Sequence, residues 1–461
     1  MFRIKIPTGC EPEQHFALKV LMEDFLGLKF TTEVYKGEDI LIYRNDSSKR
    51  LTFSSHFFRR ASRKWLKPSS MPLLPLETWD TESDGWSFEL IESVVPIIYG
   101  RPGILEGDNS CHCNLDIFGS AFFMLSRYEE LVNLKRDSHG RFPATESVAY
   151  KEGFLDRPII NEYLEILWNL LSRTWSDLVR KKFAYQRFVT CDVDWPFDPK
   201  VSYFKYGIRS AAHSLIKKGQ LIKSFKIVLQ SSMRIFGYQV NDTYRKAIDW
   251  IMAVNEEVGN KVSFYFITHN TSKLDTFDDF GSLRIRSLFK TIVERGHEVG
   301  IHPGYNTFRN PENFKQTVKK FLGILQGEKI TQKNIGGRQH YLRWDAAKTP
   351  QLWDKNLITY DSSLGYADRA GFRCGICYSF EMYDLVNREI LKTKQIPLIV
   401  MENTIISSAY EDLGYSEDAR QRFVNLSESC RRYNGLFTLL WHNTSLQSPE
   451  SRKLYLDIIK L

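Results

Sequence analysis

Two acidic residues stand two positions apart at the end of a short apolar run. The stretch "TCDVDWP", residues 190–196, contains Asp192 and Asp194 and then breaks at Trp-Pro. In a β-strand, residues two apart project to the same side, so these carboxylates would face the same space. Two carboxylates that close repel each other unless a cation lies beside them. The spacing therefore predicts a metal ion at this point of the chain.

A histidine at the end of another apolar run offers a second ligand. The stretch "RGHEVGIHPGYNT", residues 295–307, reaches His302 just before a Pro-Gly pair that stops regular structure. A carboxylate and an imidazole together suit a divalent ion such as zinc, cobalt or manganese. A single histidine on a strand is more often structural, so the hypothesis depends on the residues around it.

The elements that must position these residues alternate along the chain. From about residue 183, short apolar runs with strand character are separated by stretches with helical spacing. The runs cover residues 188–194, 261–268, 297–302, 336–342, 357–363, 396–403 and 436–443. Such alternation implies a parallel sheet with right-handed crossovers. We expect an α/β fold, in which a closed or nearly closed barrel is favoured over an open doubly wound sheet.

Further polar residues lie at the ends of these runs. In both arrangements the working residues of an α/β fold lie at the carboxyl ends of its strands. Those ends carry Arg338, His340 and Tyr341 in the fourth run, Asp361 in the fifth and His442 in the seventh. We therefore expect one site to which several strands contribute.

The same residues, in the same order, resemble the motifs of the polysaccharide deacetylases. This family, of the chitooligosaccharide deacetylase or NodB-homology type, comprises metal-dependent enzymes that remove acetyl groups from N-acetylated sugars. The motifs here are "TCDVDWP", "HEVGIHPGYN", "RQHY", "YDSSLGY" and "LLWHN", within roughly residues 183–461. The resemblance implies a distorted (β/α)7 barrel.

The first three motifs imply a role for each of their polar residues. By the resemblance, Asp192 would be the catalytic base and Asp194 a metal ligand. His302 would be the second ligand, and Arg338 would hold the base by an ion pair. The position of the family's second histidine, four residues after His302, holds Asn306.

The third ligand is therefore open between two residues. Asn306 occupies the family position and is the residue we favour, although asparagine binds zinc less strongly than histidine does. His340 stands where the family has proline, so it would either replace the missing ligand or contact the substrate. The resemblance implies zinc as the ion, with cobalt or manganese as alternatives.

The remaining motifs imply a proton donor and substrate contacts. His442 would be the general acid, and Asp361 would orient it. The backbone N–H of Tyr341 would face the oxyanion. We expect Trp195, His340 and Tyr341 to bind the substrate.

Length and composition predict two globular domains. The chain has 461 residues, 43% of them apolar, which is long for one compact domain. We expect an α+β accessory domain at residues 1–180 and the deacetylase-like barrel at residues 181–461. In the first, residues 13–28 and 115–134 have helical spacing. The charged "SRYEE" at 126–130 predicts a buried ion-pair network or a domain contact.

Cysteine content, apolar segments and charge predict where the protein is located and what it contacts. Seven cysteines, no apolar segment of signal-peptide length at the start and no membrane-length apolar run predict a cytoplasmic protein with free thiols. Residues 196–237 hold eight lysines or arginines against one aspartate. This basic insertion is either a solvated lid or a contact with a diphosphate or the inner membrane surface. The chain has no recognisable nucleic-acid motif, so we expect no nucleic-acid partner.

The preferred function is that of a hydrolase acting on a non-peptide carbon–nitrogen bond. The whole chain is similar to two-domain bacterial proteins associated with surface-polysaccharide gene clusters, which implies a metal-dependent de-N-acetylase. Its substrate would be an N-acetylated sugar or glycan precursor carried on a nucleotide or a lipid. Two alternatives remain open: a catalytically inactive sugar-binding or assembly protein, and a hydrolase of another amide or ureide bond.

Overall fold

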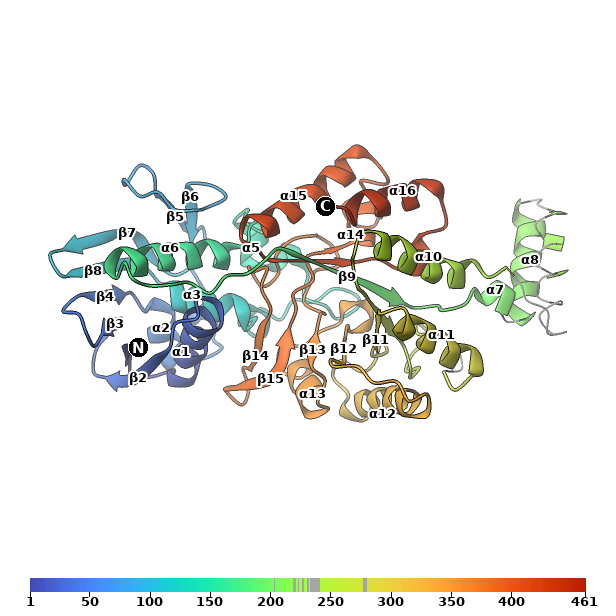
Figure 1. Ribbon diagram of the computed structural model, residues 1–461, viewed down its shortest axis with the longest axis horizontal. Helices are drawn as coiled ribbons and strands as arrows, with labels where there is room; N and C mark the ends of the chain where they lie inside the picture. The colour runs from blue at the N-terminus through green and yellow to red at the C-terminus, as the bar shows by residue number, and fades with distance from the viewer. Residues whose placement is uncertain are drawn as a thin grey trace. The chain divides into compact units, whose positions relative to one another are not determined.

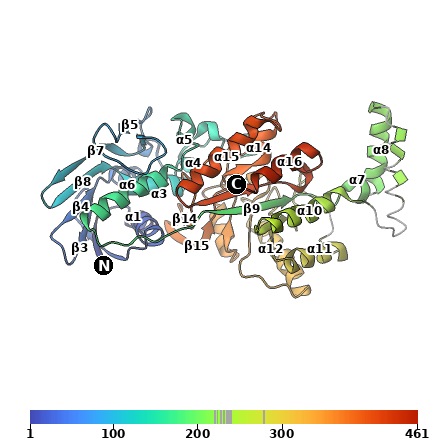
Figure 2. The same ribbon diagram turned by 45° about the horizontal axis from the view of Figure 1, so that its top comes forward.

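The computed structural model shows a chain of mixed helices and strands (Figures 1 and 2). It describes residues 1–202, 204–218, 221–222, 224–225, 228–229, 232, 241–276 and 280–461. The chain divides into two compact units. Unit 1 comprises Met1–Arg187, Tyr341–Gly414 and Gln421–Leu439, and unit 2 comprises Phe188–His340, Tyr415–Arg420 and Leu440–Leu461. The expected boundary between residues 180 and 181 stays a prediction.

Unit 2 is built on four parallel strands in the order β12-β11-β10-β9. The strands are β9 (Gln186–Val193), β10 (Val262–Phe266), β11 (Glu298–Ile301) and β12 (Gly336–Gly337). The helices are α7 (Pro199–Ser202), α8 (Phe204–Lys218), α10 (Thr243–Glu257), α11 (Leu283–Glu294), α12 (Pro311–Gly327) and α16 (Pro449–Ile458), with the short turn η5 (Asn443–Ser445). Helices therefore connect successive parallel strands, as the alternation of apolar runs predicts.

Local sequence explains where these helices begin and which face they bury. The side chain of Asn310 accepts a hydrogen bond from Asn313 N–H, and Pro311 occupies the first turn of α12. This is the cap that Asn-Pro predicts. On α10, Ile248 and Ile251 are fully buried, in agreement with their helical spacing.

The four strands of unit 2 stop in the same row. Val193 pairs with Phe266, Phe266 pairs with Ile301, and Ile301 pairs with Gly337. Because all four strands run in the same direction, the residues that follow this row leave the sheet at one edge. That edge is where parallel α/β sheets place their sites.

Unit 1 contains a six-stranded mixed sheet in the order β2-β1-β3-β4-β8-β7. Its strands are β1 (Phe2–Pro7), β2 (Phe30–Tyr35), β3 (Ile40–Arg44), β4 (Arg50–Phe53), β7 (Gly100–Gly107) and β8 (Ser110–Leu115). A separate pair is formed by β5 (Glu77–Asp80) and β6 (Val94–Ile97). The first 180 residues thus combine a mixed sheet with helices.

The helices and turns of this part of unit 1 include the two stretches whose spacing predicts helix, residues 13–28 and 115–134. They are α1 (Glu11–Leu18), η1 (Lys19–Phe25), α2 (His56–Lys64), η2 (Pro68–Ser70), α3 (Ile117–Leu125), α4 (Glu129–Val132), η3 (Ala144–Glu146), α5 (Val148–Lys151) and α6 (Ile159–Thr174). The single helix expected at residues 115–134 is divided between α3 and α4. Arg127 has a φ of 58°, a left-handed conformation that interrupts helical hydrogen bonding.

The rest of unit 1 contains both a parallel and an antiparallel pair of strands. Its elements are η4 (His340–Leu342), α13 (Thr349–Lys355), β13 (Tyr360–Asp361), β14 (Phe380–Asp384), β15 (Glu389–Gln395), β16 (Val400–Met401), α14 (Glu402–Ile406), α15 (Glu417–Arg432) and β17 (Leu436–Leu440), of which η4, α15 and β17 have residues in both units. The pair β14 and β15 is antiparallel, whereas β13 and β15 are parallel.

All seven predicted strand regions contain a strand, but three of these strands have only two residues. The antiparallel pair β14–β15 was not predicted, and among the described residues the larger sheet has nine strands. The fold is therefore mixed α/β. Closure into a (β/α)7 barrel is not confirmed and stays a prediction.

The "SRYEE" stretch forms the buried ion-pair network that its sequence predicts. The Arg127 side chain donates from Nε to Glu130 Oε1 over 2.9 Å, and it also pairs with Glu129. Glu130 in turn accepts two hydrogen bonds from Arg373, over 3.0 and 2.7 Å. These four side chains are at most 2% exposed. The network therefore joins α4 to the loop after β13 within unit 1.

Removal of the Glu130 charge should destabilise the protein strongly. Glu130→Gln leaves two buried guanidinium groups without this counter-charge, and breaking a buried ion pair costs about 3–5 kcal/mol. The free energy of unfolding by urea measures this loss. Glu106→Gln is the matched control, because its pair with Arg173 is exposed and such pairs are worth up to about 1 kcal/mol. Equal losses in the two variants would contradict the prediction.

The basic insertion lies partly outside the described residues. Lys223, Lys226 and Arg234 lie outside the described residues. Lys200 and Arg209, which belong to α7 and α8, are exposed. Throughout the described ranges of the chain, every helix is too short or too polar to cross a lipid bilayer.

Candidate metal centre

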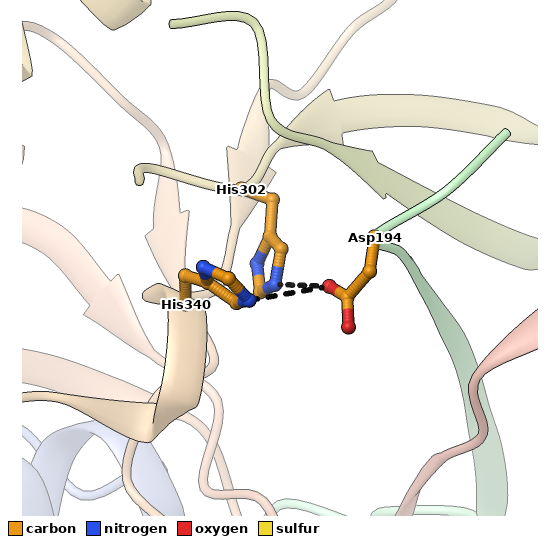
Figure 3. Close-up of side chains that lie close together, drawn as sticks. All are labelled: Asp194, His302 and His340. Atoms are coloured by element: carbon orange, nitrogen blue, oxygen red, sulfur yellow. Dashed lines mark ion pairs between the residues drawn. The ribbon is translucent and has the colours of Figure 1, made fainter. Parts of the chain in front are cut away.

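Three side chains of unit 2 bring their ligand atoms together at the edge of the sheet. His302 Nε2 lies 3.3 Å from Asp194 Oδ1, and His340 Nε2 lies 3.5 Å from the same oxygen. One ligand atom from each residue lies within 4.8 Å of the others. Figure 3 shows both imidazoles directed at the Asp194 carboxylate.

These separations suit a tetrahedral ion. Bonds of about 2.0–2.2 Å from zinc to nitrogen or oxygen place neighbouring ligand atoms roughly 3.4 Å apart. The distances of 3.3 and 3.5 Å from Asp194 Oδ1 to the two imidazoles are close to this value. One carboxylate and two imidazoles could therefore hold a divalent ion and leave a fourth position open.

Hydrogen bonding fixes the tautomer of both histidines. His302 Nδ1 lies 2.6 Å from the backbone carbonyl of Arg338, and His340 Nδ1 lies 2.7 Å from Asp275 Oδ1. A carbonyl and a carboxylate only accept, so Nδ1 carries the proton in each ring. Nε2 then presents its lone pair to the cluster, as a metal ligand requires.

Two buried polar atoms of the cluster lack a hydrogen-bond partner among the described residues. Within the described residues, Asp194 Oδ1 and His302 Nε2 are shielded from solvent and accept no hydrogen bond. The Asp194 side chain as a whole is 27% exposed, so it is Oδ1 that faces inward. Buried polar atoms are nearly always satisfied, and a cation between these two atoms would satisfy both. The residues present therefore fit a metal ion.

The second carboxylate of the motif is held by a different partner. Asp192 Oδ1 accepts a hydrogen bond from Arg338 Nη1 over 2.7 Å, and the same nitrogen donates to Thr190 Oγ1. The Arg338 guanidinium also lies 5.2 Å from the ring centre of Tyr265. Asp192 Oδ2 lies 3.7 Å from His302 Nε2. The two carboxylates thus have separate surroundings, one beside arginine and one beside imidazoles.

Before an ion binds, electrostatics favour a charged carboxylate and a protonated imidazole in this cluster, so a metal ion would take the place of the proton on His302 Nε2. Burial opposes ionisation of Asp194, but the imidazoles of His340, His302 and His442 together hold the pKa of that carboxyl well below its usual range. Burial also disfavours the imidazolium form of His302, while Asp192 and Asp194 raise its pKa above the ordinary value. Opposite charges at short range cause both shifts.

His442 and Trp195 lie beside Asp194. His442 Nε2 is 3.8 Å from Asp194 Oδ2, and its side chain is 12% exposed. The hydrogen bond from Trp441 N–H to the Thr190 carbonyl fixes the chain next to β9. Trp195 directly follows Asp194 and is partly exposed. An accessible imidazole beside the carboxylate can exchange a proton with a bound molecule.

The structure places Asn306 differently from His340. The Asn306 side chain is exposed, and its Nδ2 donates to the Thr271 carbonyl over 2.8 Å. That contact joins the turn after β11 to the loop after β10. His340 belongs to the three-residue cluster, whereas the assignment of Asn306 as a ligand stays a prediction.

Asp361 and Tyr341 belong to unit 1. Asp361 is fully buried and accepts hydrogen bonds from Trp344 Nε1 and Ser363 N–H. Tyr341 has a left-handed backbone with a φ of 62°, and its carbonyl accepts from Arg141. The orientation of His442 by Asp361 and the oxyanion contact of Tyr341 N–H stay predictions.

Asp275 is the residue that sequence reasoning missed. It is 1% exposed and lies in the loop after β10. Besides His340, its carboxylate accepts from Thr271 N–H, Thr271 Oγ1 and Tyr305 N–H over 2.7–2.8 Å. Its place in the loop that follows the carboxyl end of β10 is the one signal that could have indicated it.

A family model and a solved structure are similar to parts of this chain. Residues 2–176 match a family of unknown function, DUF7033. A search of curated proteins finds no match. A crystal structure described as a "putative polysaccharide deacetylase from Mycobacterium smegmatis" is similar over 60% of this chain and 84% of its own, with 11% identity and a TM-score of 0.38. A score this low does not establish a shared fold.

Loss of the Asp275 carboxylate should weaken metal binding without removing a ligand. Asp275→Asn keeps the shape of the side chain but loses the charge that orients His340, and such changes lower metal affinity about 10–100-fold. Titration of the metal-free protein with zinc by calorimetry measures the affinity. His340→Ala should lose more, because it removes a ligand.

Asn306→Ala is the matched control. It changes the same pair of loops without touching the three-residue cluster, so zinc affinity should stay within about twofold. Retained binding in His340→Ala together with lost binding in Asn306→Ala would show that the third ligand is Asn306.

Proposed function

We propose that the protein is a metal-dependent hydrolase that removes an acetyl group from an N-acetylated sugar. The observation that carries the proposal is the placement of Asp192. Its carboxylate is held by Arg338, within 3.7 Å of a histidine that faces the candidate metal site. A base next to a metal-ligand cluster is the arrangement that the order of the motifs led us to expect.

The cluster of Asp194, His302 and His340 would hold the ion, with zinc first and cobalt or manganese as alternatives. A bound divalent ion supplies a positive charge that polarises an amide carbonyl and makes water more acidic. The proposal takes His340 as the third ligand, since its Nε2 is directed at Asp194 and its Nδ1 is fixed by Asp275. This ligand set makes the absence of a second histidine at position 306 compatible with activity.

The two proton transfers are assigned to different residues. Asp192 takes a proton from the attacking water, and Arg338 keeps its carboxylate in place. His442 then gives a proton to the departing amine as the carbon–nitrogen bond breaks, which yields acetate and a free amino sugar. Groups of this kind each contribute about 10²–10⁴ in rate.

The substrate is proposed to be a precursor rather than a finished glycan. We propose an N-acetylated sugar carried on a nucleotide or a lipid diphosphate, in the cytoplasm. A sugar-binding protein without activity, and a hydrolase of another amide or ureide, remain the competing functions. Release of acetate from nucleotide-linked N-acetylglucosamine or N-acetylated chitooligosaccharides by the metal-loaded protein separates the proposal from both.

Asp192→Asn and His442→Ala should each lower acetate release by about 10²–10⁴, because each removes a proton-transfer group. Zinc content measured on the same samples should stay near that of the unaltered chain, which separates lost chemistry from a lost ion. His269→Ala is the matched control, since the His269 ring pairs with Lys320 and is not one of the three cluster residues. Near-normal turnover in both active-site variants would end the proposal.

The basic insertion is proposed to contact an anionic surface. On α8, the side chains of Ile208, Leu215 and Ile216 are 46%, 43% and 81% exposed, and Arg209 is exposed near them. Exposed apolar side chains together with positive charge are typical of helices that lie on anionic membranes. The proposed setting is therefore peripheral to the inner membrane.

Charge reversal on this insertion should weaken membrane binding. Lys200→Glu combined with Arg209→Glu should reduce co-sedimentation with phosphatidylglycerol vesicles, most clearly at low salt, because exposed charges are screened as salt rises. Vesicles of phosphatidylcholine alone provide the baseline. Equal sedimentation of the variant and the unaltered chain at every salt concentration would refute the membrane contact.

A further inference from the structure

A single-sign basic stripe covers the outer face of helix α2 in unit 1. The inner face is apolar, with Phe57, Phe58 and Ala61 at most 1% exposed. The other residues recur at the helical spacing i, i+3, i+4, i+7 and i+8, which are His56, Arg59, Arg60, Arg63 and Lys64. This spacing places them on one side of the helix.

The stripe lines two adjoining hollows. The larger, of about 600 Å³, also has the hydroxyl groups of Thr8, Ser62 and Ser69 in its lining, with Glu38 as its one acidic residue. The smaller, of about 360 Å³, shares His56 and Arg60 with the first. It adds Arg101 and one carboxylate, from Glu77. Positive charge and hydroxyl donors therefore gather around a concave surface.

Most of this charge is not neutralised by the protein. Arg59 pairs with Glu38, and the Arg60 guanidinium donates to the Met71 carbonyl. Among the described residues, Arg63 and Lys64 have neither an ion pair nor a side-chain hydrogen bond. Their charge is therefore available to a bound molecule.

The positive charge of the stripe also affects the pKa of His56, which lies within it. Burial lowers the pKa of His56, and the neighbouring Arg59, Arg60 and Arg101 lower it further, against a smaller opposite effect of Asp39. Nearby positive charges disfavour a further proton. The residues shared by the two hollows, His56 and Arg60, thus lie among several arginines.

A charged face on a surface helix is usually solvated and needs no ligand. On α2, however, the charges lower the stability of the helix. Arg59 and Arg63, and Arg60 and Lys64, are like charges four residues apart, and such pairs repel each other on a helix. Alternating charges would cover the same face without that repulsion. A ligand of opposite sign would remove that repulsion.

We propose that the hollows along α2 form a binding site for a phosphate-bearing ligand with two adjacent anionic groups. Guanidinium groups match phosphate oxygens with paired hydrogen bonds, and lysine adds a compact charge. The stripe runs eight residues along the helix, or about 12 Å, which is longer than one phosphate requires. This site lies in unit 1 and does not depend on the proposed deacetylase activity.

The test titrates the full, metal-free chain with inorganic pyrophosphate by calorimetry at low ionic strength. Arg63→Glu combined with Lys64→Glu should lower the affinity at least about tenfold, since two charge-assisted contacts become repulsive. Binding by the unaltered chain should weaken as salt is raised. The control is Lys29→Glu with Lys182→Glu, which reverses two exposed charges of unit 1 outside both hollows and should keep the affinity within about twofold.

Two sources of phosphate are separated in a second arm. The vesicle arm is run with Lys200→Glu and Arg209→Glu already in place, so that the basic insertion does not contribute to membrane binding. Co-sedimentation with phosphatidylglycerol vesicles that is lost when Arg63→Glu and Lys64→Glu are added, and kept with the control pair, would assign the site to a lipid headgroup, whereas pyrophosphate binding assigns it to a soluble ligand. Equal circular dichroism and melting temperature show that the variant is folded. The proposal is overturned if the unaltered chain binds neither probe, or if the Arg63/Lys64 variant binds as the unaltered chain does.

Discussion

The close approach of β11 and β12 is the constraint on which the candidate site depends. A Cβ atom at Gly337 would lie 1.8 Å from the Ile301 carbonyl oxygen, so only glycine can pair at this position. The next residue, Arg338, donates its N–H to Ile301 and accepts from His302 Nδ1 at its own carbonyl. Its guanidinium reaches Asp192. One strand pairing thus orients a histidine, holds a carboxylate and sets the path of the chain toward His340.

The two carboxylates of the first motif differ because their neighbours differ. Asp192 lies against a buried guanidinium, which neutralises it within the protein. Asp194 faces imidazole nitrogens, and its inward oxygen accepts no hydrogen bond from the described residues. A carboxylate that is already paired can keep its geometry while it exchanges a proton, whereas an unpaired one invites a cation. The proposed roles of Asp192 as base and Asp194 as metal ligand rest on this asymmetry.

The two charged clusters of unit 1 show opposite uses of charge. The network around Arg127 and Glu130 is dry and internally balanced, and it joins segments far apart in the sequence. The stripe on α2 is open to solvent and largely unbalanced. A balanced buried network fixes one arrangement of the chain, while an unbalanced exposed one is left to water, counter-ions or a bound molecule.

The sequence by itself determined the α/β class, the positions of the strands in unit 2 and the residues that end them, because period-two alternation and helix caps are local signals. It also indicated Asp194 and His302 as ligands, since their spacing and strand ends could be read directly. Only the tertiary structure chose His340 for the cluster and showed Asp275 behind it. His340 joins the cluster because the turn after β12 meets the loop after β10, where its ring contacts Asp275. These two residues are 65 positions apart, and a contact over that separation leaves no local pattern in the sequence.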